Sequence, residues 1–113
     1  MLDTSPLTAV VERFADWLRS APQSRLQQGA AAEALEVARE LSVRAQRLEA
    51  PGREALEMPE AGLFVVGDQL AVAGQDLAEA LRTAPVGDGA TAPSELLDEA
   101  VRRVEQAEVR ARR

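Results

Sequence analysis

Apolar residues recur every three or four positions along four stretches of this chain, and proline occurs in each gap between the stretches. This spacing places apolar side chains on one face of a helix. Ala, Leu, Glu and Arg dominate the composition, and all four favour helices. Strand-forming residues are scarce, with no Ile, no Tyr and three aromatic residues. The sequence therefore predicts an all-α fold.

We expect four helices, at about residues 6–19, 22–49, 60–83 and 94–112. Ser5-Pro6 is a candidate N-cap followed by proline in the first helical turn. Ser20-Ala21-Pro22-Gln23 has the pattern of a capping box that starts the second helix. Gly29 lies inside that helix and is expected to bend or fray its first turns. Pro51-Gly52 ends it, and one helical turn is expected at residues 53–58 before the third helix.

Residues 84–93 are rich in Gly, Pro and small side chains, a composition typical of a flexible linker. The other connections are short, which predicts a small antiparallel helical bundle of about four helices, the last joined by this linker. The length of 113 residues fits a single domain, residues 1–113. The last helix either packs on the bundle or extends to a partner, and the sequence leaves both alternatives open.

The net charge of −6 argues against a general affinity for nucleic acid or for an anionic membrane. No stretch reaches the roughly 20 apolar residues of a membrane-spanning helix. No basic region leads into an apolar one near the first residue, so we expect no secretory signal and a cytoplasmic location. All 13 basic residues are Arg and Ala is abundant, which indicates a GC-rich bacterial genome.

The sequence lacks most of the side chains that catalysis uses. His, Cys, Lys and Tyr are absent, which removes the imidazole base, the thiol nucleophile, the Schiff-base amine and the phenolic acid. Neither a phosphate-binding loop nor a dinucleotide-binding glycine motif is present. We therefore expect no enzyme and no cofactor. Glu33, Glu36 and Glu40 share a helix face compatible with a divalent ion, but the favoured interpretation is a solvated stripe paired with Arg39 and Arg44.

The third predicted helix carries apolar residues on two sides. Phe64, Val65 and Val72 fall on the side where an amphipathic surface helix is normally polar. A strip of small residues, which allows another helix to approach closely, runs through Gly67, Ala71, Gly74 and Ala78. The favoured interpretation is a central helix covered on both sides by its neighbours. The alternative is a self-association surface.

The last predicted helix is rich in charge and locally basic at its end. Acid-before-base pairs at a spacing of four are expected for Asp98–Arg102, Glu99–Arg103 and Glu108–Arg112. The basic residues that are candidates for contacting a partner are Arg102, Arg103, Arg110, Arg112 and Arg113. The favoured interpretation is a frayed and solvated terminal helix. The alternative is an electrostatic tail for an acidic partner or nucleic acid.

These patterns predict a non-catalytic helical protein–protein interaction module whose partner is another protein or a second copy, as in a homodimer. The speculative binding residues are Phe64, Val65 and Val72, with the five arginines as a second surface. The alternative function is a small regulatory protein that contacts nucleic acid or an acidic partner through those arginines. Nucleic acid is disfavoured because a large basic patch with stacking aromatics is missing.

Two further interpretations concern the interior. A bundle that encloses an apolar small ligand is a third class of function, but the small residues of the second and third helices favour close packing instead. Phe14 and Trp17 lie on one face of the first helix. Trp is enriched at partner interfaces, yet in a chain with so few aromatics both residues are interpreted as the bulkiest parts of the core.

Overall fold

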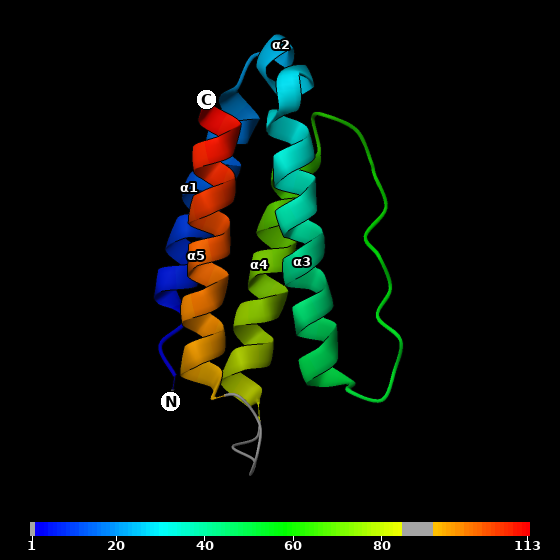
Figure 1. Cartoon of the computed structure of the whole chain (residues 1–113), viewed down its shortest axis with the longest axis vertical. Coiled ribbons are helices and arrows are strands. Elements are labelled where there is room, and N and C mark those ends of the chain that lie inside the picture. Colours follow the sequence, from blue (N-terminus) through cyan, green and yellow to red (C-terminus); the bar gives the residue numbers. More distant parts are fainter. Residues whose placement is uncertain (1, 85–91) are drawn as a thin grey trace.

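The computed structural model describes residues 2–84 and 92–113, and every regular element in this part of the chain is a helix. Figure 1 shows the long helices standing beside one another. They are α1 (Ser5–Ser20), α3 (Ala31–Glu49), α4 (Val66–Thr83) and α5 (Pro93–Arg112). The short α2 (Gln23–Arg25) and a π-helical segment (Leu26–Ala30) connect α1 to α3. The predicted all-α bundle of four helices is confirmed, and no helix among the described residues is long and apolar enough to cross a membrane.

The four long helices form a square in which α4 and α5 occupy opposite corners. Each of these two packs on both α1 and α3, and they have little contact with each other. In Figure 1, α1 and α5 run upward whereas α3 and α4 run downward. The expected antiparallel packing therefore holds for α1 with α4 and for α3 with α5. The neighbours α3 and α4 run parallel, so the chain must return along the whole bundle between them.

This return is made by residues 50–65, the long green loop of Figure 1. The predictions of a helical turn at 53–58 and of a helix beginning at residue 60 were wrong, because α4 begins at Val66. Gly62 has a φ of 108°, a left-handed conformation that a right-handed helix cannot contain. The backbone of this loop is also hydrogen-bonded to a side chain of α3. The Gln46 side chain bonds both the N–H and the C=O of Leu56, each at 2.8 Å.

The chain bends before α3 as expected, because Gly29 has a non-helical φ of 128° and so forms a kink within residues Leu26–Ala30. The predicted capping box is wrong. The Ser20 hydroxyl lies 3.2 Å from the carbonyl oxygens of Asp16 and Trp17, so it bonds the end of α1 rather than the start of the next helix. The cap at the start of α1 also differs. The carboxylate of Asp3 accepts hydrogen bonds from the Ser5 N–H at 3.0 Å and from the Ser5 hydroxyl at 2.6 Å.

The core runs through the centre of the square and is built from the predicted apolar faces. Its largest fully buried side chains are Phe14, Leu7, Leu26, Leu41, Leu70, Leu77, Leu81 and Val104. Phe14 is thus part of the core, as expected, whereas Trp17 is half-buried at the edge. The last helix packs along α1 and α3, which answers the question that the sequence left open. Of the predicted linker 84–93, residues 85–91 lie outside the described part of the chain.

Candidate interaction surfaces

The outward side of α4 carries apolar side chains that no neighbouring helix covers. The exposed fractions of Phe64 and Val72 are 71% and 53%, and that of Val65 is 38%. Val65 and Val72 are seven residues apart and so lie on the same side of the helix, two turns from each other. Phe64 precedes them in the turn that leads into α4. The interpretation of a helix covered on both sides holds for the buried Gly67 and Gly74 but not for these three residues.

Acidic side chains surround these apolar residues. Asp68 pairs with Arg19 of α1 at 2.8 Å, and Glu79 pairs with Arg82 at 2.6 Å. Asp76 is exposed and forms no ion pair within residues 2–84 and 92–113. We call this set the α4 outer surface; it comprises Phe64, Val65, Asp68, Val72, Asp76 and Glu79.

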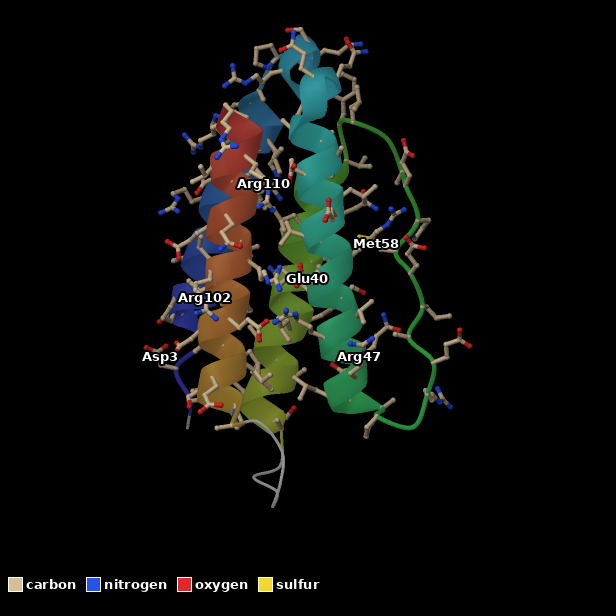
Figure 2. The ribbon with its side chains drawn as sticks, viewed as in Figure 1. Asp3, Glu40, Arg47, Met58, Arg102 and Arg110 are labelled. Carbon is tan, nitrogen blue, oxygen red and sulfur yellow. The ribbon has the colours of Figure 1, made fainter. Side chains whose placement is uncertain are left out.

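A row of ion pairs joins α3 to α5. Glu33 lies 3.0 Å from Arg110, and Glu40 lies 3.5 Å from Arg103. Glu40 also pairs with Arg44 at 2.7 Å, which is the predicted helical pair. In Figure 2, Glu40 and Arg110 both lie in the space between the two helices. Glu33 and Glu40 therefore contact α5, whereas Glu36 is exposed and forms no ion pair among the described residues. The predicted Glu36–Arg39 pair is absent, because Arg39 pairs with Glu57 of the crossover loop at 3.2 Å.

The same row affects Glu99 of α5. Arg44 donates a hydrogen bond to Glu99 at 3.1 Å, and this bond lowers the pKa of Glu99 below its usual value. Ion pairs between side chains this exposed contribute little to stability, so the row orients α5 more than it stabilises the fold. Within the part of the chain that the structure describes, no three acidic residues are grouped to hold a metal ion.

Glu108 is a buried carboxylate between two arginines. It is 5% exposed, and Arg13 of α1 contacts it at 2.7 Å while Arg112 contacts it at 2.9 Å. Burial alone would raise the pKa of Glu108, but the hydrogen bonds from both arginines outweigh burial and lower it. Arg112 also lies over the Trp17 ring, 5.2 Å from its centroid. This cluster fixes the end of α5 on α1, so the predicted frayed terminal helix is wrong.

The five candidate arginines divide into two groups. Arg103, Arg110 and Arg112 form ion pairs inside the chain, as described above. Arg102 and Arg113 are exposed and form none among the described residues. Figure 2 shows Arg102 on the side of α5 that faces away from α3. Of the three predicted acid-before-base pairs, Glu99–Arg103 and Glu108–Arg112 are present, whereas Asp98–Arg102 is not among the ion pairs.

The two exposed arginines border a shallow groove on the outward side of α5. We call it the α5 outer groove; it is lined by Arg102, Glu105, Gln106, Val109, Arg110 and Arg113. Val109 is 58% exposed and gives the groove an apolar centre. Sequence reasoning missed Val109, although a signal was available. It lies outside the apolar face that continues from Leu97 through Val104 to Ala111, and an apolar residue outside that face must be exposed.

A half-open pocket of about 220 Å³ lies where the π-helical segment meets the end of the crossover loop. Leu26, Leu35, Leu63 and Val66 contribute its apolar lining, and Glu60 is among its polar residues. Because this pocket opens to solvent, it is not the large and dry cavity that a bundle enclosing an apolar ligand would require. It gives no support to the third class of function.

No family model matches the chain, and neither the curated proteins nor the solved structures give a match.

Proposed function

We propose that this protein is a non-catalytic helical interaction module that associates with copies of itself through the α4 outer surface. The observation that carries the proposal is the exposure of Phe64, Val65 and Val72 within a stretch of nine positions at the start of α4 and in the turn that precedes it. The other long apolar side chains of α4 lie in the core. Grouped exposed apolar side chains mark interaction sites more often than isolated ones do. A cytoplasmic location and a bacterial source, expected from the sequence, belong to the same proposal.

The size of this apolar group indicates a weak association. The exposed fractions of the three side chains together equal about 1.6 fully exposed ones, so burying them would contribute about 2.5–5 kcal/mol at roughly 1.5–3 kcal/mol per large apolar side chain. Association costs about 4–15 kcal/mol in lost translational and rotational freedom. The apolar contact alone therefore does not yield a tight complex, and polar contacts must add to it or the association stays transient.

The alternative of nucleic acid or an acidic partner bound through the arginines of α5 has less support. Phosphate contacts by Arg103, Arg110 or Arg112 would have to replace ion pairs that the chain already makes. Arg102 and Arg113 remain, which is a small basic surface in a chain with a net charge of −6.

The test replaces Val72 with Glu and measures mass by light scattering over a range of protein concentrations. The wild-type mass should rise above the 12.1 kDa of one chain as the concentration increases. The mass of Val72→Glu should stay at 12.1 kDa, and its helicity by circular dichroism should equal that of wild type. Leu56→Glu is the matched control, because Leu56 is 77% exposed but lies on the crossover loop. An unchanged assembly in Val72→Glu, or an equal loss in Leu56→Glu, would refute the α4 outer surface as the interface.

A further inference from the structure

We infer that the surface which receives the α4 outer surface is the α5 outer groove of a second copy, in a head-to-tail contact. This inference rests on the proposed self-association and specifies its geometry. It follows from three features: where the two surfaces lie, which charges they carry, and how their residues are spaced.

The two surfaces lie on opposite sides of the molecule. α4 and α5 occupy opposite corners of the square, and α1 and α3 occupy the other two. A copy that uses its α4 outer surface on one side thus keeps its α5 outer groove free on the other side. A contact between two different surfaces of the same chain can repeat from copy to copy, forming a ring or an open chain.

The charges that are not neutralised inside the chain are opposite in sign. On the α4 outer surface, Asp68 and Glu79 already have arginine partners, which leaves the carboxylate of Asp76. On the α5 outer groove, Arg102 and Arg113 form no ion pair among the described residues. The single negative charge of Glu105 balances only one of their two positive charges. The first surface is therefore acidic and the second is basic.

This difference disfavours symmetric contacts. Pairing the α4 outer surface with itself would bring two Asp76 carboxylates, neither neutralised inside its own chain, into one interface. Pairing the α5 outer groove with itself would bring Arg102 and Arg113 close to the same arginines. Like charges facing each other at an interface are unfavourable, whereas opposite charges guide association and fix its orientation.

The spacing of residues on the two helices is the same. Val65, which directly precedes α4, is followed by Val72 and Asp76 at steps of seven and four positions. Arg102, Val109 and Arg113, the last of which directly follows α5, have the same steps. At about 1.5 Å per residue along a helix, these steps correspond to roughly 10.5 Å and 6 Å. If the two helices align in parallel, Val72 meets Val109 and Asp76 meets Arg113.

In the same alignment, the alkyl stem and guanidinium of Arg102 lie against Val65 and the adjacent Phe64, where they can pack on the ring. Glu105 meets the Arg19–Asp68 pair, so it faces a cation as well as a carboxylate. The contact therefore combines an apolar centre with one new ion pair and a cation–π contact. These two polar contacts add to the free energy of association, which the apolar side chains alone do not make favourable enough for a tight complex.

The test uses one variant for each surface and light scattering of their mixture. Val72→Glu disables the α4 outer surface, and Arg102→Glu/Arg113→Glu disables the α5 outer groove without breaking an ion pair among the described residues. We expect each variant alone to remain at 12.1 kDa. Mixed in equal amounts, they should form a dimer and nothing larger, because each retains one of the two surfaces.

Wild type should exceed the mass of a dimer at high concentration, and its association constant should fall by up to about fivefold in about 0.5 M salt, because salt screens the single new ion pair of the contact. Arg47→Glu is the control, since Arg47 is exposed on α3 and belongs to neither surface. Normal assembly of Arg102→Glu/Arg113→Glu, or no complex in the mixture, would overturn the head-to-tail contact while leaving the proposed self-association intact. A wild type that is monomeric throughout would overturn both.

Discussion

Gly74 of α4 lies so close to Val11 of α1 that there is no room for a side chain at position 74. A Cβ atom at Gly74 would be 2.6 Å from Val11 Cγ1 and 3.1 Å from Val11 Cβ. Because Val11 Cβ belongs to the rigid start of its side chain, rotating that side chain does not relieve the contact. This pair sets how closely α1 and α4 approach, and it explains the glycine in the middle of a helix.

Gly74→Ala should therefore destabilise the protein by about 1–3 kcal/mol, the usual cost of overpacking a core. The loss should appear even though Ala favours a helix over Gly by about 1 kcal/mol. The free energy of unfolding from urea denaturation measures the effect. Adding Val11→Ala should recover part of the loss, and a neutral or stabilising Gly74→Ala would show that α1 and α4 can separate freely.

The bend before α3 depends on the backbone of Gly29 rather than on space around it. Gly29 has a φ of 128°, and no atom lies within 4 Å of the position that a Cβ would occupy. Gly29→Ala should lower the free energy of unfolding by about 1–2 kcal/mol through backbone strain. Gly52→Ala is the matched control, because that position is equally open and its φ is not in the left-handed region. It should be neutral or stabilising by up to about 1 kcal/mol; equal effects would argue against strain at Gly29.

The Arg13–Glu108–Arg112 cluster should make stability depend on pH. The pKa of Glu108 is lower in the folded chain than its usual value, so the carboxylate contributes stability above about pH 4.3, the value for an unfolded chain. That contribution is lost as the pH falls through the lowered pKa. At pH 7, Glu108→Gln should cost about 1–3 kcal/mol in the free energy of unfolding.

The difference between wild type and Glu108→Gln should shrink as the pH drops below 4, when measured by denaturation at several pH values. Glu105→Gln is the control, because Glu105 is exposed and forms no ion pair among the described residues. A difference that stays constant between pH 7 and pH 3 would contradict the role of the Glu108 carboxylate.

The crossover loop should become accessible to protease when its contact with α3 is removed. Gln46 holds Leu56 by two hydrogen bonds of 2.8 Å, and the next contact of the loop with α3 is made by Arg39, which donates a hydrogen bond to the C=O of Met58 at 2.8 Å. Gln46→Ala should increase the rate of trypsin cleavage after Arg53 several-fold, as measured by mass spectrometry of the fragments. The exposed Gln75→Ala should leave that rate unchanged. Equal rates in wild type and Gln46→Ala would mean that other contacts hold the loop.

The sequence predicts the helices well where apolar spacing and burial agree. The faces through Leu7, Leu41, Leu70 and Val104 are all in the core. The crossover loop was not predictable in the same way, because Leu63 continues the apolar spacing of α4 backwards from Val66 to the residue next to Gly62. A single glycine costs a helix only about 1 kcal/mol, and the contacts that hold the loop come from α3, many residues away.

The candidate surfaces were predicted in part. The apolar character of Phe64, Val65 and Val72 was visible from helical spacing, and the structure adds that these side chains are exposed. The pairing of Glu33 with Arg110 and of Glu40 with Arg103 was not visible, since these partners lie in different helices. Sequence spacing reveals only pairs within one helix, so it could not separate the neutralised arginines from Arg102 and Arg113.

The most direct test of the central claim is the mass of the wild-type protein by sedimentation equilibrium at low salt, from about 10 μM to 1 mM, where weak association becomes measurable. Self-association through the α4 outer surface predicts a weight-average mass that rises steadily above 12.1 kDa across this range. A mass that stays at 12.1 kDa at every concentration would contradict it.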